Sequence, residues 1–273
     1  MADDGKVWFI TGASRGFGHV WAAAALARGD RVAVTVRDTS SVKDLVDTYG
    51  DLVLPLQLDV TDKAADEAAV QQAAEHFGRL DVVVNNAGYG QFGAIEEASE
   101  QEIRDQFETN VFGALWVTRA ALPIMRAQGG GHILQVSSIG GVAAFPNTGV
   151  YHGSKWALEG MSDSLSQEVA PFGIHVTLIE PGGYSTDWSG SSAKRAEQMD
   201  VYQPMRDRPR ASAAKPGDPD ATATAVLAVV DAAEPPLRLL LGEFPTQLVK
   251  TVYAAKLATW SDWEQVSKDA QGN

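Results

Sequence analysis

The chain of 273 residues contains no cysteine and only five histidines. Without cysteine there can be no disulfide bond, iron–sulfur cluster, thiolate zinc site or cysteine nucleophile. The histidines are dispersed along the chain, at positions 19, 76, 132, 152 and 175, and form no H-E-x-x-H pattern. The sequence therefore predicts no metal site.

Positive charge and long apolar runs are also scarce. The chain has 22 Lys and Arg residues against 35 Asp and Glu residues, a net charge of −13, which disfavours a nucleic-acid surface or a polybasic membrane anchor. The most apolar helical run, VWAAAALA, is far too short to span a bilayer. The first residues, MADDGKVWFI, do not have the pattern of a signal peptide. We expect a soluble cytoplasmic protein without nucleic-acid or membrane partners.

What the chain does have is a regular alternation of strand and helix patterns. Seven short apolar runs are typical of buried strands, and they begin near residues 6, 31, 51, 81, 132, 175 and 237. Helical patterns lie between them, among them 17–28, 62–77, 151–169 and 221–231. Apolar strands that alternate with helices indicate a parallel sheet covered on both faces. We therefore predict an α/β fold, a doubly wound Rossmann-type sheet of about seven strands, in a single domain over 1–273.

One segment breaks this rhythm. Residues 182–219 contain several Pro and Gly residues and follow no clear period. A stretch of this length inside a compact domain is typical of a lid, a binding loop or a disordered insert. Because it directly follows a strand, and ligands bind beyond the carboxyl ends of such strands, we predict a substrate lid at about 183–215.

Two glycine-rich stretches compete as the phosphate-binding loop. A literal G-x-G-x-x-G occurs at Gly88, Gly90 and Gly93, but it neither follows the first strand nor opens a helix. The stretch TGASRGFG does both, with Gly12, Gly16 and Gly18 between the first strand and the first helix. Glycines there allow a tight turn and close approach of a phosphate to a helix N-terminus.

The end of the second strand bears on the choice of cofactor. An acid at this point grips the ribose 2′-hydroxyl of NAD, whereas arginine suits the 2′-phosphate of NADP. The sequence places Arg37 there, and Arg15 lies within the glycine loop. These two residues favour NADP. Asp38 is the alternative ribose ligand if the strand ends one residue later.

These features resemble the short-chain dehydrogenase/reductase family in its short single-domain form, and its NADP-preferring members in particular. The resemblance covers the chain up to about Pro181. It rests on TGASRGFG, on LDV at 58–60, on NNAG at 85–88, on Y-x-x-x-K at Tyr151 and Lys155, and on PGGYST at 181–186. The stretches GVYHGSKWALEGMSDSL and PFGIHVTLIEPG are similar to reductases that resemble 17β-hydroxysteroid and retinol dehydrogenases.

The resemblance implies an NADP(H)-dependent oxidoreductase that interconverts a carbonyl and an alcohol, here a ketone or aldehyde reductase. It implies four catalytic residues: Asn110, Ser138, Tyr151 and Lys155. It also implies cofactor contacts from Gly12, Ser14, Arg15, Gly16, Phe17, Gly18, Arg37, Asp59, Val60, Asn86, Ala87, Gly88, Tyr151, Lys155, Pro181, Gly182 and Thr186. A homodimer or homotetramer is expected from the same resemblance, and apolar Trp156 and Leu165 on one predicted helix support it.

The chemistry explains the tyrosine and lysine. Reduction of a carbonyl needs a hydride on carbon and a proton on oxygen, and a free tyrosine has a pKa of about 10. An ammonium one helical turn away favours the phenolate, so we expect Lys155 to lower the pKa of Tyr151. Ser138 is expected to bind the same substrate oxygen, with Ser137 as its rival. The alternatives are a cofactor-sensing protein without turnover and an NAD-dependent alcohol dehydrogenase.

Overall fold

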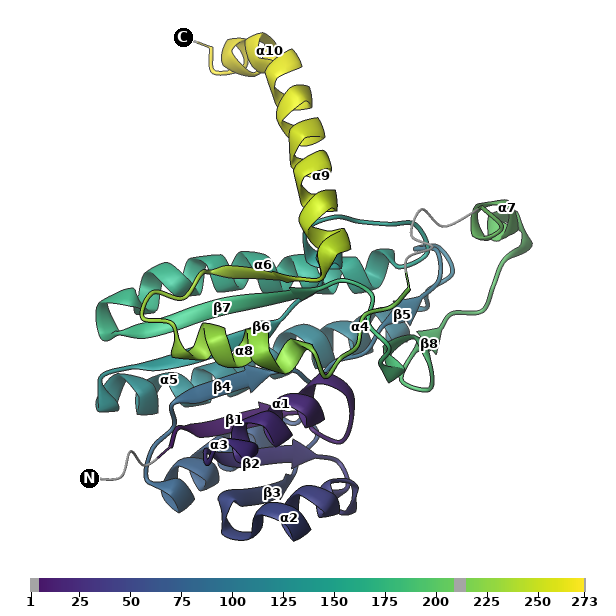
Figure 1. Ribbon diagram of the computed structural model, residues 1–273. Helices are drawn as coiled ribbons and strands as arrows, with labels where there is room; N and C mark the ends of the chain where they lie inside the picture. Colours follow the sequence, from purple (N-terminus) through teal and green to yellow (C-terminus); the bar gives the residue numbers. More distant parts are fainter. Residues whose placement is uncertain (1–4, 209–214, 273) are drawn as a thin grey trace.

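A seven-stranded, all-parallel sheet forms the centre of the molecule. The structure is a computed structural model that describes residues 5–208 and 215–272. The strands run in the order β3-β2-β1-β4-β6-β7-β9 (Figure 1). Their bounds are Val7–Thr11 (β1), Arg31–Val36 (β2), Val53–Gln57 (β3), Val82–Asn85 (β4), Gly131–Val136 (β6), Ile174–Pro181 (β7) and Arg238–Leu241 (β9). The predicted doubly wound sheet is confirmed, and the winding direction reverses between β1 and β4.

Helices cover both faces of the sheet because alternate strand residues point to opposite sides. Trp8 and Ile10 of β1 belong to one core cluster, whereas Val7 and Phe9 belong to the other. The first cluster includes side chains of α1 (Gly16–Ala27), α2 (Lys43–Tyr49) and α8 (Thr222–Asp231). The second includes side chains of α3 (Lys63–Phe77) and α5 (Ala114–Gln128), and the C-terminal end of α6 (Gly149–Val169). Of these helices, α1, α3, α6 and α8 lie within two residues of the ranges predicted for them.

The helical segment that precedes β6 is divided into two α-helices. α4 (Glu100–Phe107) begins at a capping box, in which Ser99 and Glu102 bond each other's backbone N–H. A π-helical turn at Glu108–Gly113 then separates α4 from α5. Turns of this kind occur frequently at functional sites.

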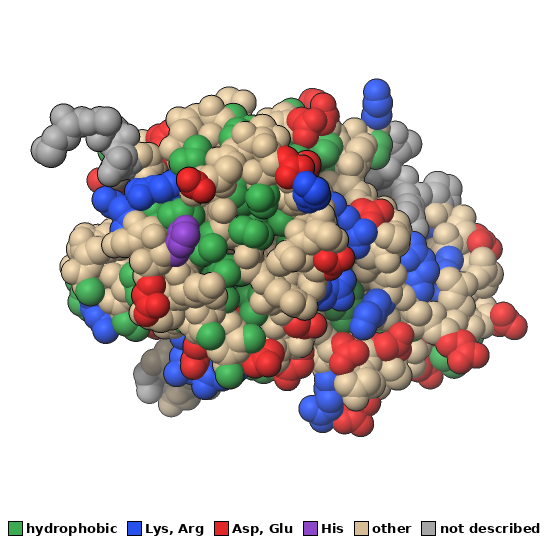
Figure 2. Space-filling model, turned by 90° about the horizontal axis from the view of Figure 1, so that it is seen from below, with side chains coloured by type: hydrophobic (Ala, Val, Ile, Leu, Met, Phe, Trp, Pro, Cys, Tyr) green, Lys and Arg blue, Asp and Glu red, His purple; other side chains and the backbone are tan. Residues whose placement is uncertain are grey.

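The elements outside the main sheet were not predicted, apart from a final helix. β5 (Gln91–Phe92) and β8 (Lys194–Arg195) form a small parallel pair. α7 (Gln203–Arg206) follows β8, and residues 209–214 of the predicted lid lie outside the described residues. α9 (Glu243–Asp262) projects away from the body and ends in α10 (Glu264–Asp269) (Figure 1). Within 5–208 and 215–272, no helix has the length and apolar character needed to cross a membrane. Figure 2 shows hydrophobic side chains gathered near the middle of one face, with acidic and basic side chains scattered irregularly around them.

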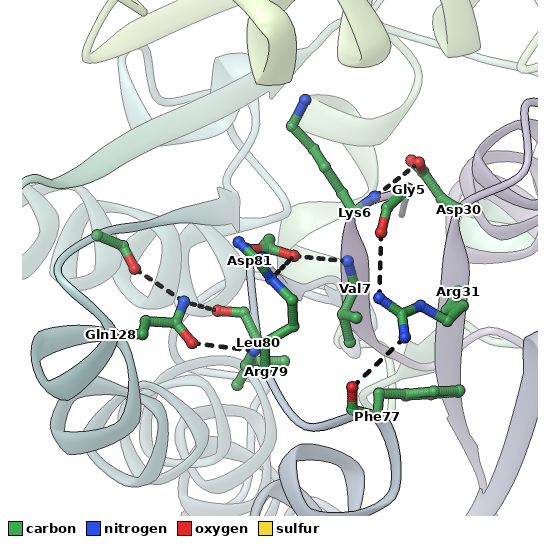
Figure 3. Close-up of polar contacts among 11 residues, drawn as sticks. Gly5, Lys6, Val7, Asp30, Arg31, Phe77, Arg79, Leu80, Asp81 and Gln128 are labelled. Atoms are coloured by element: carbon green, nitrogen blue, oxygen red, sulfur yellow. Dashed lines mark hydrogen bonds and ion pairs between the residues drawn. The ribbon is translucent and has the colours of Figure 1, made fainter. Parts of the chain in front are cut away.

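Polar contacts close the amino ends of the strands. Asp81 accepts a hydrogen bond from Val7 N at 2.8 Å, and Lys6 N donates to Asp30 Oδ1 at 3.0 Å (Figure 3). The other oxygen of Asp30 accepts bonds from Trp8 Nε1 at 2.7 Å and from Arg28 Nε at 2.6 Å. The buried Asp30 carboxylate therefore accepts three hydrogen bonds at the amino ends of the strands, which lie opposite the predicted site.

We expect Asp30→Ala to destabilise the fold by about 3 kcal/mol, because it leaves the buried indole N–H of Trp8 and the Nε of Arg28 without their acceptor, although Arg28 keeps its contact with Asp231. Urea unfolding measures this loss. Asp47→Ala is the matched control, since Asp47 pairs with Lys43 on the surface at 2.6 Å and should contribute under about 0.5 kcal/mol. Equal losses in the two variants would contradict the assigned role.

Candidate functional site

A cavity of about 1440 Å³ opens at the carboxyl ends of the strands. It is lined by every site residue predicted from the sequence except Gly18 and Asn110. Gly18 packs against Asn86, and Asn110 bonds the backbone of Tyr89, so both contact lining residues of the wall. Segments far apart in the chain therefore converge on one cavity, at the place where the switch in winding direction predicts it.

The glycine loop is held in place by the NNAG stretch. Asn86 Nδ2 donates to Thr11 O at 2.9 Å and to Gly12 O at 3.0 Å, and Thr11 Oγ1 accepts from Ala87 N at 3.0 Å. A Cβ on Gly12 would lie 2.9 Å from Ala87 Cα, and a Cβ on Gly18 would lie 2.5 Å from Asn86 Nδ2. The loop therefore needs glycine at these positions.

Gly16 begins α1 with a φ of +59°, and the nearest atoms to a Cβ there would be 3.8 Å away, in Thr186. Because Gly16 lines the cavity, the unpaired N–H groups of the first turn of α1 lie at its edge. A helix N-terminus beside a glycine loop is suited to a phosphate. The cradle fits an elongated anionic ligand.

The second glycine-rich stretch, at Gly88, Gly90 and Gly93, instead contacts the lid segment. A Cβ on Gly90 would lie 2.6 Å from the ring of Trp188, and a Cβ on Gly93 would lie 2.8 Å from Ala196 Cβ. Trp188 and Ala196 both belong to the predicted lid. The literal G-x-G-x-x-G match thus marks a surface on which the lid packs, as its position away from the first strand suggested.

Both predicted arginines line the cavity. β2 ends at Val36, so Arg37 stands directly after the strand. Asp38 caps the following turn, where its side chain accepts a hydrogen bond from Ser40 N at 2.9 Å, and this bond lowers the pKa of Asp38. Asp38 is not among the lining residues. This geometry favours Arg37 over Asp38 as the residue that meets a ligand.

Arg15 has partners in the lid segment. Its Nη1 lies 2.7 Å from Asp187 Oδ2, and its Nη2 donates to Ser192 Oγ at 2.7 Å. Arg15 therefore connects the glycine loop with the lid. An anion bound at the loop would compete with Asp187 for this guanidinium.

Asp59 and Val60 form the next part of the wall. Asp59 accepts a bond from Thr61 N at 3.1 Å, whereas the N-cap of α3 is Asp62. Asp59 is exposed and keeps one carboxylate oxygen for a ligand. Asp59 is therefore not the N-cap of the following helix.

Tyr151 and Lys155 lie one turn apart on α6, and both are buried. Lys155 Nζ is 5.9 Å from the centroid of the Tyr151 ring and donates to Val136 O at 2.7 Å. Ser138 follows β6, and its Oγ accepts from Gly140 N at 3.0 Å. All three residues line the same cavity, so a phenol, an ammonium and a hydroxyl face one space.

The expected lowering of the pKa of Tyr151 is wrong for this structure. Burial raises the pKa of Tyr151 to about 12, and only the hydrogen bond with Ser138 acts against it. The ring of Trp188 covers the phenol, with centroids 5.0 Å apart. Burial also lowers the pKa of Lys155 to about 8, against the opposing charge of Glu159. The sequence could show the pair but not how completely it is enclosed.

Asn110 lies inside the π-helical turn and is 1% exposed. Its Nδ2 donates to Tyr89 O at 3.1 Å and to Ser154 Oγ at 3.2 Å, while its Oδ1 accepts from Tyr89 N at 3.1 Å. A Cβ on Gly88 would lie 3.0 Å from Asn110 Oδ1 and 3.7 Å from Lys155 Nζ. The amide thus fixes the backbone next to Lys155.

His152, the residue after Tyr151, is buried. Its Nε2 lies 2.8 Å from Thr148 Oγ1, and burial lowers its pKa. The ring lines the cavity beside Phe145, with centroids 5.6 Å apart. The only sequence feature that could have indicated this cavity position is that His152 directly follows Tyr151.

The lid segment is tied to the body at three places. Arg15 binds its beginning, β8 pairs with β5 in its middle, and Arg206 binds Glu97 at 2.8 Å near its end. The side chain of Glu97 is fully buried and also accepts from Met199 N at 2.8 Å. The cavity surface on this side includes Phe92, Trp188, Lys194, Met205 and Arg206.

The glycine loop also contains a literal G-x-S-x-G, at Gly12, Ser14 and Gly16, a pattern known from serine hydrolases. The nearby histidine, His19, has both ring nitrogens engaged. Nδ1 faces Ala13 O at 3.2 Å, and Nε2 faces Asp44 Oδ2 at 3.1 Å. Neither nitrogen is available to Ser14 as a general base, so this geometry does not support a hydrolase.

Comparison with known proteins agrees with the site. Residues 6–197 match the family model described as short chain dehydrogenase. The chain is 42% identical over 270 residues to an oxidoreductase of Botryotinia fuckeliana, named BOA17, which covers 96% of this chain and 98% of the relative.

Solved structures agree as well. A short-chain dehydrogenase from Streptomyces avermitilis has a TM-score of 0.92 and 40% identity, over 99% of this chain and all of that one. Two other solved structures have a TM-score of 0.76. One is a Burkholderia cenocepacia short-chain dehydrogenase in complex with NADP, which is 26% identical over 96% of this chain and 98% of that chain. The other is a Brucella melitensis 3-ketoacyl-(acyl-carrier-protein) reductase complexed with NADH, which is 27% identical over 87% of this chain and 97% of that chain. The chain therefore belongs to the short-chain dehydrogenase family of oxidoreductases.

Proposed function

We propose that the protein is an NADP(H)-dependent oxidoreductase that interconverts a carbonyl and an alcohol, and that it reduces a ketone or aldehyde. The observation that carries this proposal is the convergence of Tyr151, Lys155 and Ser138 on one cavity with the glycine loop. Fold alone would not support it, because related folds host unrelated functions.

We assign the roles that the family resemblance implies, and the shared cavity supports them. When bound, the nicotinamide supplies or accepts the hydride. Tyr151 donates a proton to the substrate oxygen during reduction, and Ser138 bonds the same oxygen and orients it. Lys155 holds the nicotinamide ribose and stabilises the phenolate that remains. Asn110 holds a water in the path that returns a proton to Lys155. Pro181, Gly182 and Thr186 position the nicotinamide.

The preference for NADP is supported by Arg37 and Arg15, which line the end of the cavity near β2. A 2′-phosphate is suited to guanidinium groups. The alternative, an NAD-dependent alcohol dehydrogenase, needs Asp38 at the ribose, and that carboxylate is engaged as a cap. A cofactor sensor without turnover would not need a tyrosine, a lysine and a serine lining the same cavity, so their convergence favours an enzyme.

The lid segment supports an apolar substrate. We propose that the described part of the predicted lid, residues 183–208, covers the substrate and that the ring of Trp188 forms an aromatic wall beside Tyr151. The Trp188 ring stands 5.1 Å from the Phe92 ring and 5.0 Å from the Tyr151 ring, centroid to centroid. A bulky apolar group next to the carbonyl would pack against this wall.

We expect Trp188→Ala to lower kcat/KM for aryl ketones about tenfold, since an aromatic contact contributes up to about 1.5 kcal/mol beyond its burial. Small aliphatic ketones should lose much less. Steady-state kinetics on a matched pair of ketones measures this, with Trp188→Phe as the control that keeps an aromatic face. An equal loss for both ketones would show that Trp188 acts only through the lid.

We also propose a homodimer or homotetramer. Of the two apolar residues that motivated this expectation, Trp156 is 43% exposed, with Lys256 Nζ 4.4 Å from its ring centroid. Leu165 instead packs against the core. Only Trp156 supports an interface.

The direct test of the proposed function is a panel of ketones, aldehydes and their alcohols with NADPH, NADH and the oxidised cofactors. The absorbance of the reduced nicotinamide reports turnover. Reduction of carbonyls with NADPH is the expected result. Tight cofactor binding without turnover across the panel would favour the sensor instead.

A further inference from the structure

A buried cluster of charged groups lies beside the proposed catalytic lysine and outside the roles given above. Glu159 on α6 and Glu180 on β7 are 7% and 2% exposed. Arg238 on β9 places its Nε 3.2 Å from Glu159 Oε2 and 3.6 Å from Glu180 Oε1. Its Nη2 reaches Asp163 near the surface at 2.9 Å. Two buried carboxyl groups thus share one guanidinium.

Within the described part of the chain, two carboxylate oxygens of this cluster have unsatisfied hydrogen-bonding capacity. Among the described residues, Glu159 Oε1 and Glu180 Oε1 have no hydrogen-bond partner. Two carboxylates that face each other in a buried place cannot both keep a charge, so one takes a proton. Burial and the charge of Glu159 raise the pKa of Glu180 to about 8. Burial also raises the pKa of Glu159, but the Ser137 hydroxyl and Arg238 act against it. Because Glu159 lies closer to Arg238 than Glu180 does, we assign the negative charge of the pair to Glu159.

Glu159 stands one helical turn after Lys155. Its charge raises the pKa of Lys155, whereas burial lowers it. Gly141 shows how closely this carboxyl approaches the cavity wall. A Cβ there would lie 2.6 Å from Ser137 Oγ and 3.1 Å from Glu159 Oε1, and Ser137 lines the cavity.

We propose that Glu159 and Glu180, holding one proton between them, are positioning residues that keep Lys155 in its ammonium form. The inference rests on the proposed function for its catalytic meaning. Glu159 supplies the negative charge, Glu180 carries the proton, and Arg238 keeps Glu159 ionised. Along α6, Lys155 and Asp163 are the charged neighbours of the cluster, and Tyr151 is the titratable neighbour of Lys155.

The direct test is an NMR titration of Lys155 Cε in protein labelled with ¹³C-lysine, with the signal assigned through Lys155→Arg. Glu159→Gln should lower the midpoint of the Lys155 titration by about one pH unit, as expected for the loss of a charge one helical turn away. Glu180→Gln should lower it much less, because Glu180 stays protonated until its own pKa of about 8 is reached. Glu168→Gln, an exposed acid near the end of the same helix, is the matched control and should leave the midpoint unchanged.

The second readout is the alkaline limb of kcat/KM against pH, which should move with the NMR midpoint. Arg238→Gln is the second variant in case Glu159→Gln fails to fold. It removes the cation that keeps Glu159 ionised, so it should lower the Lys155 midpoint in the same direction. An unchanged midpoint in Glu159→Gln or Arg238→Gln, or equal shifts in Glu159→Gln and Glu180→Gln, would overturn the inference. A shifted midpoint in a protein without turnover would support the inference and contradict the proposed function.

Discussion

Tyr151→Phe should reduce kcat for carbonyl reduction by about 10²–10⁴-fold, the usual contribution of a positioned general acid. The substitution keeps the aromatic ring and removes only the transferable proton. Because the phenol of Tyr151 is buried, water has little access to replace it. Single-turnover kinetics with saturating cofactor measures the loss. The dissociation constant of the cofactor should change little.

Tyr89→Phe is the matched control for this prediction. Tyr89 also lines the cavity, and its hydroxyl has no hydrogen-bond partner among the described residues. Removal of that hydroxyl should leave kcat nearly unchanged. If Tyr151→Phe retained the turnover of the natural protein, the assignment of Tyr151 as the acid would be wrong, although the family membership would stand.

Arg37→Ala should weaken NADPH binding while leaving NADH binding almost unchanged. A charge-assisted contact contributes about 1.5–3 kcal/mol, so the loss should be roughly tenfold to over a hundredfold. Arg15 should retain part of the preference, since its guanidinium also lines the cavity. Because Arg37 is exposed, high salt should reduce the preference. Fluorescence titration with both cofactors measures these constants.

Lys43→Ala is the control for a general loss of positive charge near this end of β2. Its ammonium is 71% exposed and pairs with Asp47, so the two cofactors should keep their order. Equal losses for NADPH and NADH in Arg37→Ala, or a natural protein that prefers NADH, would reject the NADP assignment. Asp38 would then become the candidate ribose ligand.

The sheet was predictable because its strands are apolar runs separated by helices of ordinary length. Most other cavity residues were named through the family resemblance, whereas the glycine loop was predictable because its glycine spacing reports backbone geometry directly. Gly12 and Gly18 illustrate this, since a Cβ at either would enter the Asn86–Ala87 backbone or side chain. Local sequence constraints of this kind survive without knowledge of the tertiary structure.

Properties that depend on distant contacts were not predictable. The burial of Tyr151 depends on Trp188, whose ring packs on the Tyr151 ring although it lies much later in the chain. The burial of His152 depends on Phe145 and Gly140, which the helical period does not report. The pairing of β5 with β8 joins segments about 100 residues apart, each only two residues long. Such short strands leave no period to detect.

The π-helical turn at Glu108–Gly113 also has a consequence for inheritance. A π turn holds one residue more than an α-helical turn, so the loss of a single codon within it would leave an ordinary helix. The shortened segment would still close one turn, so α4 and α5 would keep their relative orientation and only the residues of the turn itself, Asn110 among them, would change position. The orientation of the Asn110 side chain thus depends on the number of residues in this turn as well as on the residue at position 110. Descendants of the gene could abandon or regain this amide geometry through one in-frame deletion or insertion, without any change in the sheet.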